Sequence, residues 1–172
     1  NSLASVALSQ LLGIDFATTR KALIHFTGSD RRFEYKGKLG EVTILDDYAH
    51  HPTEITATLN AAQNYPHNRV VCVFQPHTYT RTKAFMDDFA KALSQADIVV
   101  LADIYAAREK DTLGISSLDL LEKIKEIGTE CYHFPTFDEI ETFLLEKCEK
   151  NDLLITMGAG DVVKIGENLL GN

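Results

Sequence analysis

The stretch from Ile44 to Glu54 concentrates side chains that can do chemistry. It reads Ile-Leu-Asp-Asp-Tyr-Ala-His-His-Pro-Thr-Glu, which places two carboxylates, a phenol and two imidazoles side by side. Imidazoles exchange protons near neutral pH, and carboxylates accept protons or bind cations. The apolar residues before the cluster indicate a strand, while Pro52 and Glu54 suit the first turn of a helix. We therefore expect a loop that carries chemistry between a strand and a helix.

The cluster has several possible uses. Asp46 or Asp47 could do no more than cap the helix that follows. His51 could belong to a local hydrogen-bond network, which makes His50 the better functional candidate, because a helix N-terminus favours an anion nearby. Together with His77, these acids and imidazoles could instead bind zinc or manganese, although neither a His-x3-His pair nor a cysteine accompanies them.

A second polar segment, Gln75 to Arg81, follows the apolar run from Val70 to Phe74. Arg81 falls at the start of an expected helix, where a cation is electrostatically misplaced unless an anion accompanies it. Arg81 is therefore a candidate clamp for a carboxylate or a phosphate. The alternative is an ordinary surface arginine.

Two further segments follow apolar runs in the same way. Asp103, Tyr105 and Glu109 come after one such run, but an acid after a strand is common, and residues 108–111 could form a plain solvated turn. The Gly158-Ala159-Gly160 sequence after another run could present backbone N–H groups to an anion, although a glycine turn before a helix needs no ligand.

Apolar periodicity predicts an alternation of strands and helices from residue 41 onward. The expected strands are 41–45, 69–74, 98–102, 131–134 and 153–157, and the expected helices are 53–64, 82–93, 117–127, 137–147 and one from Asp161. Several strands are continuously apolar, which is typical of parallel strands covered on both faces. The predicted class is α/β, with an open, mostly parallel sheet. Because ligands bind beyond the carboxyl ends of such strands, the four polar segments should line one rim.

The residues before this pattern are expected to form two helices, 3–12 and 16–26, with Asp15 as a cap and Gly28 as an end. Since they precede any strand, they could belong to a neighbouring domain, which gives expected domains of 1–28 and 29–172. Residues 31–36 and 39–45 alternate around Gly37 and suit a hairpin or two adjacent strands.

The composition is that of a globular protein, with 172 residues, 45% of them hydrophobic. The net charge of −8 disfavours nucleic-acid and anionic-membrane binding, and the longest apolar runs are far shorter than the roughly 20 residues that span a bilayer. The three cysteines, Cys72, Cys131 and Cys148, lack metal-ligand spacing, which favours reduced thiols in a cytoplasm. Cys72 is expected in the core.

Four motifs carry a resemblance to a known family: Asp46 to Glu54, Phe74 to Thr82, Arg31 to Glu34, and Gly158 to Asp161. Together they resemble the carboxy-terminal part of the Mur ligases, and most closely the branch that adds L-alanine to UDP-N-acetylmuramate. The resemblance covers almost the whole chain, since the residues before Gly13 look like the last helical part of that family's central domain.

The resemblance implies a cytoplasmic enzyme of peptidoglycan precursor synthesis and a Rossmann-like sheet. In such enzymes ATP, assisted by Mg²⁺, activates the muramate carboxylate as an acyl phosphate, which the amine of L-alanine attacks. ADP and phosphate are released. The carboxy-terminal domain closes over ATP bound mainly by the central domain and supplies much of the amino-acid site, while an amino-terminal domain holds the UDP sugar.

The same motifs imply roles for individual residues. Arg32, Asp47 and His50 are expected to contact the nucleotide, and Tyr48, His77 and Arg81 are expected to face the alanine or the muramoyl carboxylate. Of these, His50, His77 and Arg81 are the expected catalytic residues, and no metal ligand is expected in this chain.

Two departures from the family's pattern are visible. Thr78 stands where many members have an arginine. The chain also contains no Gly-x4-Gly-Lys-[Ser/Thr] phosphate loop, so we expect this part to be inactive without its partner domains. A stand-alone nucleotide- or anion-binding module and a metal-dependent hydrolase are the alternatives.

Overall fold

The structure is a computed structural model that describes residues 2–26 and 28–171. It divides into two compact units, residues 1–30 and 31–172. This division falls two residues beyond the boundary expected after residue 28. The assignment of the first unit to a neighbouring domain stays a prediction.

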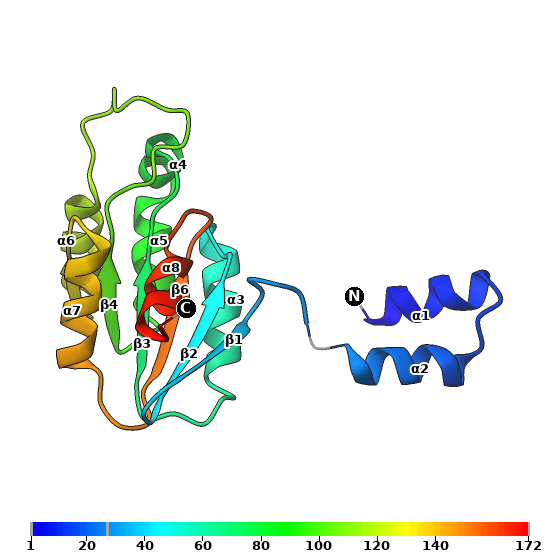
Figure 1. Cartoon of the computed structure of the whole chain (residues 1–172). Helices are drawn as coiled ribbons and strands as arrows, with labels where there is room; N and C mark the ends of the chain where they lie inside the picture. The colour runs from blue at the N-terminus through cyan, green and yellow to red at the C-terminus, as the bar shows by residue number, and fades with distance from the viewer. Residues whose placement is uncertain (1, 27, 172) are drawn as a thin grey trace. The chain divides into compact units, whose positions relative to one another are not determined.

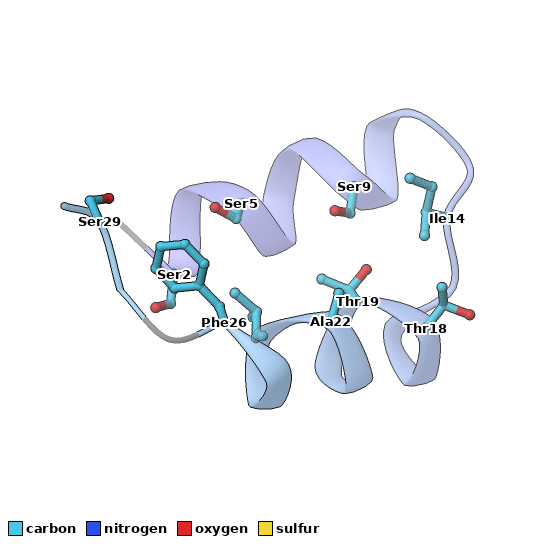
Figure 2. Close-up of a pocket in the computed structure, with 10 residues that line it drawn as sticks. Ser2, Ser5, Ser9, Ile14, Thr18, Thr19, Ala22, Phe26 and Ser29 are labelled. Carbon is cyan, nitrogen blue, oxygen red and sulfur yellow. The ribbon is translucent and has the colours of Figure 1, made fainter.

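The first unit is a pair of helices, α1 (Ser2–Leu11) and α2 (Phe16–His25), joined by a short turn. Asp15 caps α2, as expected, by accepting a hydrogen bond from the Thr18 N–H at 2.9 Å. Residues of both helices line a groove of about 520 Å³ (Figure 2). Of the described residues in these helices, only Thr19 is buried. Neither these nor the other described helices are long and apolar enough to cross a membrane.

The second unit is built on a six-stranded sheet in the order β1-β2-β6-β3-β4-β5 (Figure 1). Its strands are β1 (Glu34–Leu39), β2 (Val42–Asp47), β3 (Val70–Phe74), β4 (Ile98–Leu101), β5 (Glu130–His133) and β6 (Leu153–Met157). The hairpin partner β1 is antiparallel to β2, and all the other neighbours are parallel. The predicted open, mostly parallel sheet is confirmed.

Helices cover both faces of this sheet, as predicted (Figure 1). Their bounds are α3 (Pro52–Ala62), α4 (Tyr79–Ala84), α5 (Met86–Leu93), α6 (Ser117–Ile127), α7 (Phe137–Lys147) and α8 (Val163–Leu169). Helices α3, α5 and α6 pack on one face, where Phe74 and Phe89 are fully buried. Helices α7 and α8 pack on the other, around Val73 and Ile140. Successive side chains of a strand point to opposite faces of the sheet. Because the strands are continuously apolar, a hydrophobic core forms on each face.

The hairpin is confirmed, but its turn lies at residues 40–41 rather than at Gly37. Gly37 sits inside β1 at an irregularity in the register, where a Cβ atom would lie 3.0 Å from the side chain of Leu170. The strand expected from residue 31 begins only at Glu34, because Arg31 and Phe33 have φ values of 55° and 48°. Such angles are incompatible with an extended strand.

The helix expected over 82–93 is wrong in its extent, because α4 and α5 are separate helices. Phe85 breaks the run with φ −117° and ψ 22°. Its ring lies 4.8 Å from the ring of His51 and 6.5 Å from that of Phe89, between centroids. Phe85 therefore packs against both His51 and Phe89 at the point where α4 ends and α5 begins. The last helix begins at Val163 rather than Asp161.

The cysteines behave as predicted for reduced thiols. All three are free, and Cys72 and Cys131 are buried. Burial raises the pKa of Cys72 and of Cys131 to about 12, and that of Cys148 to about 11. Cys72 is a core residue, as expected.

Candidate functional site

The four polar segments meet along one rim of the sheet, as predicted. Because β2, β6, β3 and β4 are adjacent and parallel, their carboxyl ends point the same way. Backbone hydrogen bonds link the segments: the Gly158 N–H donates to the Asp47 carbonyl at 3.1 Å, and the Thr78 N–H donates to the Tyr105 carbonyl at 2.9 Å. Distant parts of the chain therefore form one continuous surface.

A run of rings crosses this rim. The ring centroids of Tyr48 and His50 are 5.4 Å apart, those of His50 and His77 are 5.9 Å apart, and those of His77 and Tyr105 are 5.5 Å apart. The guanidinium of Arg32 lies 6.0 Å from the Tyr48 ring centroid. Four residues selected from the sequence are thus brought together: Arg32, Tyr48, His50 and His77. Tyr105 joins them from the segment that follows β4.

Arg81 lies on α4, one turn beyond His77. Because α4 has six residues, Arg81 belongs to its last turn as well as its beginning. A cation is favourable in the last turn of a helix, so the position of Arg81 in α4 does not by itself require an accompanying anion. Burial supplies a better reason, since the Nη1 atom of Arg81 is buried and has no hydrogen-bond partner.

Unpartnered buried atoms gather in the Gln75–Arg81 segment. Among the described residues, Gln75 Oε1, His77 Nδ1 and Arg81 Nη1 are buried without a hydrogen-bond partner, and the remaining such atom is Ser94 Oγ at the end of α5. Leaving a buried polar group unpaired costs about 1–3 kcal/mol. Three such groups in one segment make this segment the candidate site for a polar ligand.

His77 is set up to be neutral at physiological pH. Burial lowers the pKa of its imidazole, and the charges of Arg81 and His50 act in the same direction, while Glu109 opposes them. A neutral imidazole keeps one nitrogen lone pair and can accept a proton or a hydrogen bond.

His50 is oriented by the loop that carries it. Its Nδ1 lies 2.9 Å from the carbonyl oxygen of Tyr48, which can only accept. Nδ1 therefore carries the proton in the neutral ring, and Nε2 carries the lone pair. The backbone N–H of His50 donates to a carboxylate oxygen of Glu54 at 3.1 Å, which ties the loop to the first turn of α3.

The carboxylate of Asp47 is already engaged by the backbone. Its Oδ2 accepts from the Phe33 N–H and its Oδ1 from the Ala49 N–H, both at 2.8 Å, and the residue is 5% exposed. The helix-capping use of Asp46 or Asp47 is wrong, because His51 caps α3 by accepting from the Thr53 N–H at 3.3 Å. Local hydrogen bonding is therefore the observed role of His51.

Asp46 is the centre of a buried network that the sequence did not reveal. Its Oδ2 accepts from Nε of Arg31 at 2.8 Å, and its Oδ1 accepts from the Thr156 hydroxyl at 2.7 Å. Burial raises the pKa of Asp46, against the opposing effect of Arg31 and Thr156. The only available signal was the cationic pair Arg31-Arg32, and only the structure shows that Arg31 is the member that binds Asp46.

The guanidinium of Arg31 also holds the turn after β6. It donates to the carbonyl of Gly158 at 2.7 Å and to that of Gly160 at 3.2 Å. The Gly158 N–H is bonded to Asp47, so it is not available to an anion as the sequence suggested. Glycine is required here for space: a Cβ at Gly158 would lie 2.9 Å from the Gln75 carbonyl oxygen, and one at Gly160 would lie 2.5 Å from Gln75 Oε1.

Metal binding finds no ligand set within the part of the chain that the structure describes. No group of three or more His, Cys, Asp or Glu residues is placed there to hold a metal ion. At the rim, the His133 imidazole and the Asp103 carboxylate form a contact of two possible ligand types, with His133 Nε2 2.7 Å from Asp103 Oδ1.

Comparison with known proteins identifies the family. The family described as "Mur ligase, glutamate ligase domain" matches residues 31–160. The chain belongs to this family. The matched range contains every site residue selected from the sequence, and it begins where the second unit begins.

Curated relatives and solved structures agree with this assignment. UDP-N-acetylmuramate–L-alanine ligases of Agathobacter rectalis and Lachnospira eligens are 64% and 59% identical over 170 residues, each covering 99% of this chain. The structure resembles that of a UDP-N-acetylmuramate–alanine ligase from Thermotoga maritima, with a TM-score of 0.82, 31% identity and 99% of this chain covered. The chain spans 37% of the length of both curated relatives and 36% of the solved chain.

Proposed function

We propose that this chain is the carboxy-terminal domain of an ATP-dependent ligase that joins L-alanine to UDP-N-acetylmuramate in the cytoplasm. The observation that carries the proposal is the set of unpartnered buried atoms on Gln75, His77 and Arg81, at the rim where the family motifs converge. The names of the most similar curated relatives supply the reaction.

Arg81 is suited to bind a substrate carboxylate. Its buried, unpaired Nη1 belongs to a planar guanidinium that can donate two parallel hydrogen bonds to a carboxylate. Both L-alanine and the muramoyl group carry a carboxylate. We assign Arg81 to this contact, with Tyr48 and His77 beside it.

His77 is suited to handle the proton of the attacking amine. Amide formation requires an uncharged amine, so the alanine ammonium must lose a proton before its nitrogen can attack the activated carboxylate and release phosphate. The lowered pKa of His77 keeps its imidazole neutral and able to accept that proton. Arg81 beside it disfavours a charged imidazole and so returns the proton to solvent.

The nucleotide is assigned to the Arg32 end of the ring run. Arg32 is exposed and fits a phosphate, and His50 presents Nε2 at the same rim. Asp47 fits a positioning role better than a direct contact, because backbone N–H groups occupy both of its oxygens. ATP bound here would supply the phosphoryl group that activates the carboxylate. We assign Mg²⁺ mainly to the central domain, because the described residues of this chain contain no group of three or more His, Cys, Asp or Glu side chains placed to hold a metal ion.

The first unit is assigned to the interface with a central domain. Its helices expose large apolar side chains such as Leu3, Leu11 and Ile24, at 86%, 85% and 67%. A helix pair without a core of its own needs a partner to cover such residues. The amino-terminal and central domains of the same enzyme are the proposed partners.

The proposal is tested by alanine-dependent release of ADP. The full-length enzyme containing this chain should release ADP only when ATP, UDP-N-acetylmuramate and L-alanine are all present. This chain by itself should release none, because it contains no phosphate loop. If the full-length enzyme released ADP with another amino acid but not with L-alanine, the assignment of L-alanine as the substrate would be refuted. If this chain alone released ADP, the proposal that the active site is shared between domains would be refuted.

A further inference from the structure

Helix α4 carries Arg81 but lacks a capping side chain of its own. Its N-cap residue, Thr78, has a φ of 66°, and the Thr78 side chain makes no capping hydrogen bond to the helix. A β-branched residue rarely adopts this angle, and a helix of six residues is unstable in isolation. Contacts from outside the helix must therefore hold it in place.

Glu109 provides such a contact from the segment after β4. Its Oε2 accepts a hydrogen bond from the Thr80 N–H at 3.0 Å, and its Oε1 accepts one from the Thr80 hydroxyl. The hydroxyl and backbone N–H of Thr80 lower the pKa of Glu109, so the group is ionised at neutral pH. A carboxylate 29 residues along the chain thus caps the first turn of α4.

The backbone completes this attachment. His77 and Tyr105 form an isolated parallel bridge, the Tyr105 N–H donates to the Pro76 carbonyl at 2.8 Å, and the Thr78 N–H donates to the Tyr105 carbonyl at 2.9 Å. The His77 ring also stacks on the Tyr105 ring. The segment 76–80 is therefore held along the segment 105–109 at both of its ends.

We propose that Glu109 is a positioning residue which, through Thr80, fixes α4 so that His77 and Arg81 stay directed at the amino-acid substrate. Arg81 directly follows Thr80, so a shift of the first turn of α4 moves the guanidinium. The inference rests on the proposed function for the identity of the substrate, whereas the attachment itself rests on the observed hydrogen bonds. Glu109 is not assigned a substrate contact.

The test compares Glu109→Ala, Glu109→Gln and Asp111→Asn in the full-length enzyme. Glutamine keeps one acceptor oxygen without the charge, whereas alanine removes both. Asp111 is the matched control, because it lies in the same segment but accepts from the N–H groups of Leu113 and Gly114 within its own turn. We expect Glu109→Ala to raise the alanine KM about 10-fold, with a smaller change in kcat. Glu109→Gln should give an intermediate effect, and Asp111→Asn should match the wild type.

A spectroscopic readout separates positioning from general damage. Because Arg81 directly follows Thr80, Glu109→Gln should shift the NMR resonances of the Arg81 side chain while leaving the melting temperature of this chain near that of the wild type. Loss of the Glu109 charge should also lower the titration midpoint of His77. Glu109→Gln also serves if the alanine variant does not fold. Wild-type alanine KM in the Glu109 variants, or an equal rise in Asp111→Asn, would overturn the proposal.

The two proposals fail in distinguishable ways. Full-length wild-type enzyme without alanine-dependent activity would refute the proposed function and leave the NMR comparison of this chain to decide the role of Glu109. In that comparison, unchanged Arg81 side-chain resonances in Glu109→Gln would overturn the positioning role, because loss of the charge alone can lower the His77 midpoint.

Discussion

At the scale of residues, burial explains why Arg81 and His77 are the strongest candidates. Both side chains present a polar atom that is buried and unpaired, and the Arg81 charge contributes to the lowered pKa of His77. Thr78, the N-cap residue of α4, has a positive φ of 66° and makes no side-chain capping hydrogen bond. Arg81 is the cation that this segment places at the rim.

Replacing Arg81 should weaken catalysis without unfolding the protein. We expect Arg81→Ala to lower kcat/KM of the full-length enzyme at least ~10-fold, since a hydrogen bond to a charged group contributes about 1.5–3 kcal/mol. Arg81→Lys should recover only part of the loss, because lysine keeps the charge but not the planar fork. Lys83→Ala is the control, an exposed cation on the same helix. Wild-type kinetics in Arg81→Ala would remove this residue from the site.

The titration of His77 should be displaced to low pH. Its NMR midpoint in this chain, assigned with His77→Gln, should lie below the ordinary value of 6.5 and should rise in Arg81→Gln. Since the folded pKa is below the unfolded one, the unfolded chain binds this proton more readily. Acidification from about pH 6.5 toward the folded pKa should therefore reduce the stability contribution of this group. A midpoint at or above 6.5 would contradict the burial of the ring.

At the scale of elements, the rim depends on side chains that join strand ends. Asp46 at the end of β2 is bonded to Thr156 on neighbouring β6 and to Arg31 before β1, and Arg31 reaches the carbonyl oxygens of Gly158 and Gly160. The sheet register places Asp46 opposite Thr156. These bonds fix the loops on which Tyr48 and His50 lie.

Removing the Thr156 hydroxyl should destabilise the sheet unit. Valine has nearly the same shape as threonine, but Thr156→Val removes the hydroxyl that donates to Oδ1 of the buried Asp46. Leaving this oxygen without a donor should lower the free energy of unfolding by about 1–3 kcal/mol. Urea unfolding of this chain measures the change. Thr142→Val, at an exposed position on α7, should change stability by less than ~0.5 kcal/mol. Equal effects of the two substitutions would show that the Asp46 network does not stabilise the fold.

At the scale of the whole molecule, the two units differ in how they are stabilised. The sheet unit contains two buried clusters, whereas the described residues of α1 and α2 bury only Thr19. Helices of ten residues are marginal in water without tertiary packing. The first unit therefore depends on a covering surface, which we assign to a central domain.

Hydrogen exchange should reveal this difference. In this chain, amides of α1 and α2 should exchange far faster than those of β3 and β6, because local opening of the helix pair exposes little buried surface. In the full-length enzyme the same helix amides should become protected. Protection of α1 and α2 in this chain equal to that of β3 would contradict the assignment.

The sequence by itself determined the elements and the segments that carry chemistry. Periodicity of two and of 3.6 residues is local information, so the bounds of α6, α7 and β6 could be predicted without a structure. The rim followed because parallel strands end on the same side. Residue types then marked Tyr48, His50, His77 and Arg81 as candidates, whose catalytic and binding roles stay predictions.

Only the tertiary structure decided which member of each neighbouring pair turns inward. Arg31 rather than Arg32 binds Asp46, and two adjacent arginines in the sequence give no basis for choosing between them. Glu109 caps α4 because strand order brings the segment after β4 beside the segment after β3. Such pairings depend on register and sheet order, which are set by contacts between residues far apart in the chain and leave no local pattern to read.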